Sequence, residues 1–110
     1  PAHGSEIVKI ILNDENLKSL WLKDLSSLRN RIREMRVSLN SNLIELGCNK
    51  DFSFIVDQNG MFSFSGISTE DVQKLRNEYS IYIVDSGRVN IAGITSKNIN
   101  YISESINKVV

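Results

Sequence analysis

One apolar stripe constrains the fold of this chain more than any other feature of the sequence. Nine apolar residues recur from position 17 with a mean spacing of about 3.6 residues, the period of an α-helix. They are Leu17, Trp21, Leu25, Leu28, Ile32, Met35, Leu39, Leu43 and Leu46. A helix of about 32 residues is roughly 48 Å long. A domain of this size has a radius of gyration of only about 13 Å. We therefore expect part of the helix to project, or to lie against something absent from this chain.

The signals at the ends of this stripe fit a single long helix over residues 15–46. Asn13 or Asp14 is suited to cap the first turn, and Glu15 favours the positive end of the helix dipole. Gly47 follows the last apolar residue and suits a left-handed helix end. A shorter helix is predicted over residues 5–12, where isoleucines recur at helical spacing.

The rest of the chain predicts two β-hairpins and two helices. Asn-Gly at 59–60 separates two apolar runs, 51–56 and 61–64, and such a dipeptide favours a tight hairpin turn. A second hairpin is predicted from 82–84 and 89–92. The expected fold class is α/β of an α+β-like kind, in which helices cover a small, largely antiparallel sheet.

Two helix starts are predicted after the hairpin strands. Ser68, followed by acidic residues, is expected to cap a helix, and Thr95 or Ser96 to cap the last one. Their apolar stripes are expected to face the core: Val72, Leu75 and Tyr79 in the first helix, and Ile99, Ile102 and Ile106 in the second.

Composition excludes several classes of function. Thirteen basic and thirteen acidic residues give a net charge of zero, so the concentrated positive charge that binds nucleic acid or anionic membranes is absent. No apolar run approaches the length of a membrane span. The single cysteine, Cys48, and the single histidine, His3, cannot form an internal disulfide, a metal cluster or a His-based triad. We expect no metal site and an intracellular, cytoplasmic setting.

Most polar and aromatic residues on the long helix are expected to have ordinary structural roles. Arg29, Arg31, Arg33 and Arg36 crowd one stretch, but they spread around the helix and alternate with Glu34. This pattern is typical of a solvated face rather than a binding patch. Trp21 and Met35 belong to the apolar stripe, so core packing is predicted for both. His3 and Cys48 are expected to make only local contacts.

Arg88 differs from the other charged residues by its place in the pattern. It follows Gly87 at a predicted turn and precedes Val89 and Ile91, which are expected to be buried. A guanidinium between apolar strands needs an acceptor or access to a cleft, because an unpaired buried charge is strongly disfavoured. From the residues alone, a structural ion pair and a binding role for Arg88 both stay open.

Two motifs resemble one enzyme family. Asn-Gly-Met-Phe-Ser-Phe-Ser-Gly at 59–66 and Ser-Gly-Arg-Val-Asn-Ile-Ala-Gly at 86–93 are similar to the C-terminal portion of the aspartate aminotransferases. These enzymes belong to the fold-type-I group that uses pyridoxal phosphate. Asn90 is closer to the aspartate branch than to the aromatic branch of the family. Three further stretches extend the likeness over the whole chain: 1–4, 31–36 and 51–55.

The resemblance implies a role for two residues. Arg88 matches the arginine that binds the α-carboxylate of the amino-acid or keto-acid substrate, and Phe62 matches a phenylalanine that lines the active-site cleft. It also implies a division of the chain: 1–14 as a remnant of the large cofactor-binding domain, 15–46 as the interdomain connector helix, and 47–110 as the remainder of the C-terminal small domain, which closes over substrate.

The resemblance further implies which groups this chain lacks. The cofactor lysine of the family stands in a Ser-x-Ser-Lys-Asn type of context, and Thr-Ser-Lys-Asn at 95–98 echoes it only superficially. Lys97 is predicted to be a solvent-exposed lysine near the start of the last helix, because an activated amine needs burial or cationic neighbours. No catalytic and no cofactor-binding residue is therefore expected here, and these 110 residues alone are expected to be inactive in transamination.

The implied full-length enzyme is a homodimer that uses pyridoxal 5'-phosphate to exchange an amino group between aspartate and 2-oxoglutarate, giving oxaloacetate and glutamate. A mitochondrial location is an alternative to the cytoplasm. Two other functions stay open. One is an aromatic amino acid aminotransferase, and the other is a non-enzymatic module in which the apolar face of the long helix docks a partner.

Overall fold

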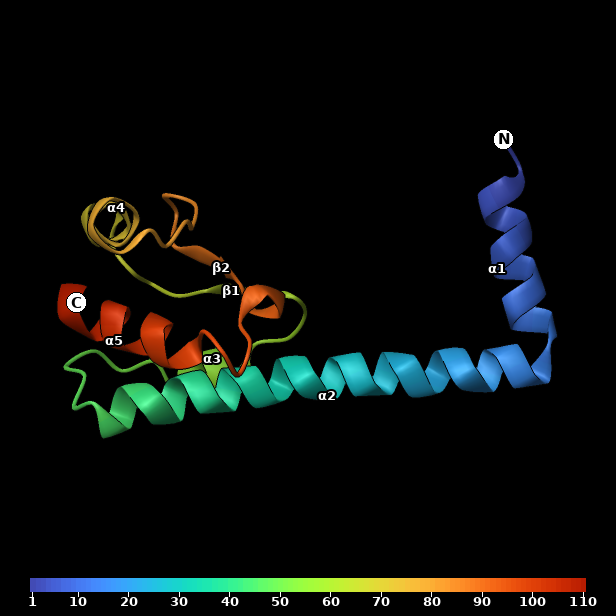
Figure 1. Ribbon diagram of the computed structural model, residues 1–110, viewed down its shortest axis with the longest axis horizontal. Helices are drawn as coiled ribbons and strands as arrows, with labels where there is room; N and C mark the ends of the chain where they lie inside the picture. The colour runs from blue at the N-terminus through green and yellow to red at the C-terminus, as the bar shows by residue number, and fades with distance from the viewer. The chain divides into compact units, whose positions relative to one another are not determined.

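The computed structural model describes residues 1–110 and is predominantly helical. Its helices are α1 (His3–Asn13), α2 (Glu15–Glu45), α3 (Phe54–Asp57), α4 (Thr69–Tyr79) and α5 (Ile99–Val109), with a 3-10 turn η1 (Ile91–Gly93). The strands are β1 (Phe62–Phe64) and β2 (Arg88–Asn90), which form one antiparallel pair. Figure 1 shows these elements along the chain. The predicted class, helices on a small antiparallel sheet, is confirmed.

The chain divides into two compact units, Pro1–Arg31 and Ile32–Val110. The first consists of α1 and the first half of α2, and it contains no buried residue. Trp21 is 43% exposed there, so the prediction that it packs in a core is wrong for this chain. Two helices with exposed apolar faces do not enclose a core by themselves.

The predicted ends of the long helix are confirmed. The Asp14 carboxylate accepts hydrogen bonds from the backbone N–H groups of Asn16 and Leu17, both at 2.9 Å, and so caps the first turn of α2. At the other end Gly47 adopts a φ of 69°, the left-handed conformation that stops a helix.

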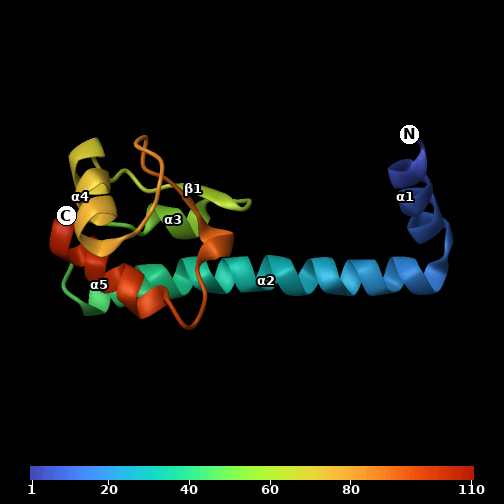
Figure 2. The ribbon, with the colours of Figure 1, turned by 45° about the horizontal axis from the view of Figure 1, so that its top comes forward.

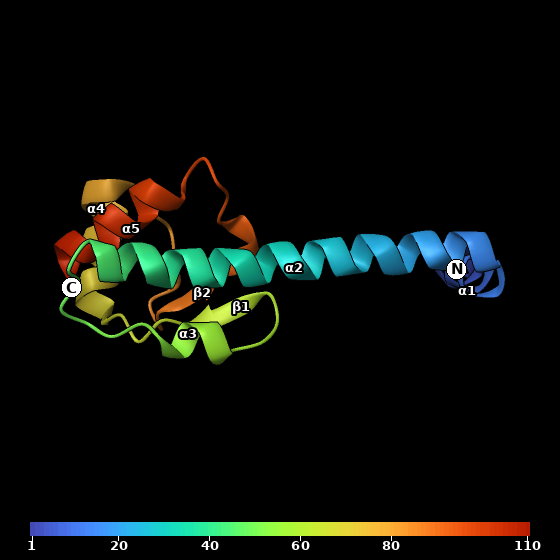
Figure 3. The same cartoon turned by 90° about the horizontal axis from the view of Figure 1, so that it is seen from below.

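The second unit folds around one apolar core. In it α5 runs alongside the C-terminal half of α2, and the amide of Asn107 donates to the carbonyl of Leu46 at 3.4 Å. Figure 2 shows α4 beside α5, where the Tyr101 hydroxyl donates to the carbonyl of Tyr79 at 2.7 Å. In Figure 3, α5 and α3 lie on opposite sides of this half of α2. The core residues are Leu39, Leu43, Phe52, Ile55, Ile67, Val72, Leu75, Ile91, Ile94, Ile99 and Ile106.

Neither predicted hairpin forms. Residues 54–57 are helical, because Phe52 and Ile55 are both buried and a helical turn, unlike a strand, points residues three apart to the same side. Residues 82–84 form no strand, and the carbonyl of Ile83 accepts a hydrogen bond from Arg76 of α4 at 3.0 Å instead of from a partner strand. The strands that do pair, β1 and β2, are the second strands of the two predicted hairpins, matched as Phe62 to Asn90, Ser63 to Val89 and Phe64 to Arg88.

The cap predicted for α4 is confirmed and the one for α5 is wrong. The Ser68 hydroxyl accepts from the N–H of Asp71 at 3.1 Å. Helix α5 begins only at Ile99, because the side chain of Asn98 accepts from the N–H of Thr95 at 2.7 Å and donates to the carbonyl of Gly93 at 3.1 Å. These two bonds hold residues 94–98 as a non-helical loop between η1 and α5. None of the helices combines the length and the apolar character needed to cross a bilayer.

Candidate functional site

The two residues singled out by the motifs lie in contact on the exposed face of the β1–β2 pair. Side chains alternate along a strand, so Phe62 and Phe64 share one face of β1, and Ser63 points to the buried face. On β2, Arg88 belongs to the exposed face as well. Its guanidinium carbon lies 5.0 Å from the centroid of the Phe62 ring, a cation–π distance. A phenylalanine that is 45% exposed thus forms a platform for a solvent-accessible cation.

The guanidinium of Arg88 has no carboxylate partner in the structure. The neighbouring ion pair, Arg76 with Asp85 at 2.7 Å, leaves Arg88 out, and no side-chain hydrogen bond engages it. The structural ion pair that the residues alone left open for Arg88 is therefore not formed. Since five N–H donors of a planar fork remain available, the site can accept an anion by two parallel hydrogen bonds.

Gly87 fixes the direction from which the chain enters β2. Its φ is +77°, and a Cβ there would lie 2.9 Å from the carbonyl oxygen of Ile67. The carbonyl of Gly87 accepts from the N–H of Ser65 at 3.0 Å and from the Ser65 hydroxyl at 2.6 Å. A residue with a side chain is excluded by both the conformation and the space. The backbone conformation of the turn before Arg88 is therefore fixed, and so is the position from which the Arg88 side chain extends.

Helix α4 holds the segment that leads to this turn. Arg76 forms its ion pair with Asp85, and the hydroxyl of Thr69 donates to the carbonyl of Asp85 at 3.1 Å. These contacts connect residue 85, three positions before Arg88, to both ends of α4. The position of the site arginine therefore depends on the packing of α4 as well as on the sheet.

Arg36 is buried beneath the same strand pair, so the prediction of a solvated face is wrong for this residue. It is 2% exposed, and burial lowers the pKa of its guanidinium, which stays charged because the ordinary pKa of arginine is so high. Its partners are the carbonyl oxygens of Ile55 at 3.0 Å, Gly60 at 2.6 Å and Phe62 at 3.2 Å, together with the Ser63 hydroxyl.

The sequence did contain a signal for this burial. Arg36 follows Ile32 by four residues and precedes Leu39 by three, which places it on the apolar face of the helix. The spread of the four arginines around the helix is therefore compatible with one of them, Arg36, lying on the apolar face.

The outer edge of β1 is closed by side chains. The amide of Gln58 donates to the carbonyl of Phe64 at 3.1 Å and accepts from the N–H of Phe64 at 3.0 Å, as a neighbouring strand would. On the same edge the guanidinium of Arg36 donates a hydrogen bond to the carbonyl of Phe62. Sequence reasoning missed Gln58, which it placed in a hairpin turn.

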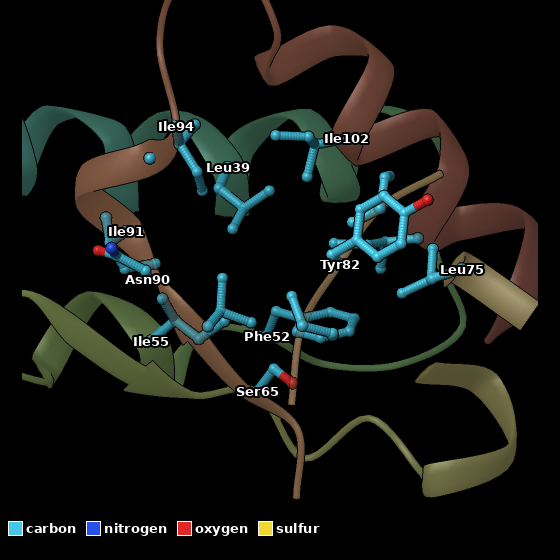
Figure 4. A pocket seen from close by; sticks show the side chains of 15 residues that line it. Leu39, Phe52, Ile55, Ser65, Leu75, Tyr82, Asn90, Ile91, Ile94 and Ile102 are labelled. Atoms are coloured by element: carbon cyan, nitrogen blue, oxygen red, sulfur yellow. The ribbon is translucent and has the colours of Figure 1, made fainter. Parts of the chain in front are cut away.

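An apolar cavity of about 220 Å³ lies on the buried side of the strand pair (Figure 4). Side chains from α2, α4, α5 and the two strand segments point into it, with Leu39 and Ile102 on one side and Phe52 on the opposite side. None of its lining side chains carries a charge. A carboxylate there would lose its hydration without gaining a partner, so the cavity does not suit an anionic substrate, and the exposed face with Arg88 does.

The remaining candidates stay apart from this face. Lys97 is exposed in the turn before α5, and His3 is exposed in the first turn of α1. Cys48 is a partly buried free thiol packed against the core. No group of three His, Cys, Asp or Glu side chains is arranged to hold a metal ion.

Comparison with known proteins places this geometry in context. A model of the family described as aminotransferase class I and II matches residues 1–106. An aspartate aminotransferase of Haemophilus influenzae is 50% identical over 109 residues, which are 99% of this chain and 28% of that protein. The chain therefore spans little more than a quarter of that relative's length.

Two solved structures are closely similar. The cytoplasmic aspartate aminotransferase of Saccharomyces cerevisiae matches with a TM-score of 0.95 and 38% identity, over 99% of this chain and 26% of that one. The aromatic-amino-acid aminotransferase of Burkholderia pseudomallei, solved covalently bound to pyridoxal phosphate, matches with a TM-score of 0.97 and 39% identity, over 99% and 27%.

Proposed function

The chain belongs to the class I and II aminotransferase family, and we propose that it is the C-terminal part of an aspartate aminotransferase. The full-length enzyme transfers an amino group from aspartate to 2-oxoglutarate with the aid of pyridoxal phosphate, and yields oxaloacetate and glutamate. The observation that carries the proposal is the free guanidinium of Arg88, 5.0 Å from the ring of Phe62 on an exposed strand face. The names of the relatives supply the substrate class.

In this proposal Arg88 binds the α-carboxylate of the amino acid or keto acid. A planar guanidinium holds a carboxylate by two parallel charge-assisted hydrogen bonds, which fixes the orientation of the substrate as well as its place. Phe62 forms the apolar wall behind it. Its ring restricts the rotamers of Arg88 before substrate arrives, so less conformational entropy is lost on binding.

Pyridoxal phosphate, when bound, supplies the electron sink for amino-group transfer. The residues of this chain do not fit the anchoring role, because a Schiff-base lysine is activated by burial or by cationic neighbours, and none of the lysines here is buried. Lys97 is exposed, Lys74 pairs with Asp71 at 2.9 Å, and Lys50 donates to the carbonyl of Gly66. We propose that the cofactor lysine belongs to the part of the enzyme that these residues do not include, and that the 110 residues are inactive on their own.

The same proposal assigns the segments of the chain. Residues 1–14 belong to the large cofactor-binding domain, 15–46 form the connector helix, and 47–110 complete the small domain that closes over substrate. Closure brings Arg88 onto the carboxylate and excludes water. The full-length enzyme is a homodimer in the cytoplasm or the mitochondrion, and it binds neither nucleic acid nor membranes.

The experiment that tests the function is substitution of Arg88 in the full-length protein. Arg88→Ala is expected to lower kcat/KM for aspartate by about 30-fold to several thousand-fold, which corresponds to about 2–5 kcal/mol for truncating one partner of a charge pair. Arg88→Lys is also expected to be poor, since a point charge does not reproduce the fork. Arg33→Ala, at an exposed arginine of α2, is the matched control and keeps wild-type kinetics.

Near-wild-type kcat/KM for aspartate in Arg88→Ala contradicts the α-carboxylate role of Arg88. A full-length protein that turns over neither aspartate nor phenylalanine contradicts the enzyme assignment and leaves the helix-docking module as the better explanation. An aromatic substrate is the second candidate, favoured by the match to the Burkholderia pseudomallei enzyme at a TM-score of 0.97. Turnover of aspartate and of phenylalanine by the full-length protein separates the two. A higher kcat/KM for phenylalanine selects the aromatic activity.

A further inference from the structure

We propose that Arg36 is a positioning residue, which holds β1 from its buried side and thereby places the Phe62 ring against Arg88. The contacts that support this inference all lie within the second unit, Ile32–Val110. Its kinetic consequence rests on the proposed function of Arg88.

The first support is the set of atoms that Arg36 contacts. One terminal nitrogen donates to the carbonyl of Ile55 at 3.0 Å and to the Ser63 hydroxyl, and the other donates to the carbonyls of Gly60 at 2.6 Å and Phe62 at 3.2 Å. One side chain thus joins α3, the turn after it and the start of β1. All four acceptors are uncharged, so the guanidinium is used for its fork of donors rather than to neutralise a carboxylate.

The second support is how little else holds β1 in place. The strand has three residues and pairs with β2 on one edge only. On the other edge its hydrogen-bonding groups meet side chains, Arg36 at Phe62 and Gln58 at Phe64. A two-stranded pair is at best marginally stable by itself, so these side-chain contacts set the place of the strand.

The third support is the alternation of side chains along β1. Ser63 points inward to Arg36, and its neighbour Phe62 points outward to Arg88. Arg36 therefore bonds to the carbonyl of Phe62 itself and to the side chain of the next residue. A shift of this short segment moves the Phe62 ring directly, and with it the surface on which Arg88 lies.

Lysine is not an adequate substitute at this position. The ammonium group of lysine has three N–H donors on one nitrogen. The four acceptors here bond to two different nitrogens of the planar guanidinium, which one ammonium nitrogen cannot replace. Leaving buried carbonyls without donors is costly. We therefore expect Arg36→Lys to leave part of this set unsatisfied and to displace residues 60–63.

The test uses the full-length protein with 4-fluorophenylalanine incorporated at position 62, where the partly exposed ring tolerates the label. The variants are Arg36→Lys, Arg36→Met and the milder Ser63→Ala, which removes one acceptor. Arg33→Met, at an exposed position of the same helix, is the matched control. The fluorine NMR signal of residue 62 is expected to shift or broaden in the three variants and to stay unchanged in the control.

Steady-state kinetics distinguish a positioning role of Arg36 from a purely structural one, because a purely structural role does not change KM and kcat separately. Arg36→Lys is expected to raise KM for aspartate about tenfold with a smaller change in kcat, because ground-state binding of the carboxylate is what the misplaced arginine loses. In an Arg88→Ala background the same substitution is expected to change KM by less than about twofold. The reason is that Arg36 affects substrate binding only through Arg88, so the two substitutions are not additive.

Two results overturn the inference. One is an unchanged fluorine signal in a folded Arg36→Lys or Ser63→Ala protein. The other is an additive effect of Arg36 and Arg88 on KM when Arg88→Ala by itself raises KM. Failure of the proposed function looks different: the fluorine signal then responds to Arg36, while Arg88→Ala turns over aspartate like the wild type. That pattern supports the positioning of Phe62 and removes only the substrate role of Arg88.

Discussion

Leu43 and Leu25 belong to the same apolar stripe of α2, but Leu43 is 1% exposed and Leu25 is 47% exposed. The spacing of apolar residues is the same in both halves of the helix. In the second half, residues 48–110 return to the apolar face and cover it. In the first half, within Pro1–Arg31, no residue is buried. A helical period thus specifies which face of a helix is apolar, and the rest of the fold decides whether that face is covered.

The largest expected effect comes from shortening one leucine in each half. Leu43→Ala is expected to lower the free energy of unfolding of the 110-residue chain by about 2–5 kcal/mol, since it leaves a cavity in a packed core. Leu25→Ala is expected to change it by less than about 0.5 kcal/mol, as for other surface positions. Urea unfolding followed by circular dichroism measures both.

The full-length protein sharpens this comparison. If its remaining residues cover the first half of α2, Leu25→Ala becomes costly there and the two substitutions approach each other. Equal costs already in the 110-residue chain contradict the division into a covered and an uncovered half, because they require Leu25 to be packed as well as Leu43.

A smaller effect is expected from removing one helix cap in each unit. Ser68→Ala deletes the acceptor for the N–H of Asp71 and is expected to cost about 1 kcal/mol of global stability. Helix α4 contributes Val72 and Leu75 to the core, so its loss spreads to the whole unit. Asp14→Ala is expected to fray the first turn of α2 without changing the unfolding of Ile32–Val110.

Two probes separate these outcomes. Trp21, the single tryptophan, reports on the first unit by fluorescence, and isoleucine methyl NMR signals report on the core. A Ser68→Ala protein whose methyl signals unfold at the wild-type urea concentration contradicts the prediction, as does an Asp14→Ala protein in which they unfold earlier.

The smallest expected effect is a pH dependence confined to the second unit. The pKa of Asp71 lies below its ordinary value of 3.8, because Lys74 and then Ser68 donate hydrogen bonds to its carboxylate. A carboxyl that binds its proton more weakly when folded gives stability that is complete above its unfolded pKa and is lost as the pH falls through the folded one.

The free energy of unfolding is therefore expected to decline from about pH 5 downward. Asp71→Asn is expected to remove part of that decline, and the part removed is expected to be smaller than the loss of stability caused by Ser68→Ala. Asp24→Asn, at an exposed carboxylate of the first unit, is the matched control. Urea midpoints between neutral and acid pH measure the difference. Identical pH profiles for Asp71→Asn and the wild type are the contrary result.

Three features that follow from local sequence were predicted correctly, whereas the cap of α5 was not. The two ends of α2, at Asp14 and Gly47, and the cap of α4 at Ser68 depend on residues within one turn of each other. The motifs at 59–66 and 86–93 also indicated that Phe62 and Arg88 belong to one site, and the structure brings them into contact. Their roles toward substrate stay predictions.

The features that depend on distant partners were not predictable in the same way. The Asn-Gly dipeptide at 59–60 favours a hairpin, but β1 pairs with β2, more than twenty residues along the chain. Arg36 reaches acceptors between 19 and 27 positions away. Turn propensity and local charge pattern carry no information about such contacts. The helical period places Arg36 on the apolar face of α2, but it does not indicate which strand supplies the acceptors.

The closed outer edge of β1 has a consequence for self-association. A bare strand edge is a template on which other chains add strands and begin to aggregate, and here the Gln58 amide already occupies that place beside Phe64. The Gln58 amide therefore leaves no free backbone group at Phe64 on which a second chain could begin a strand.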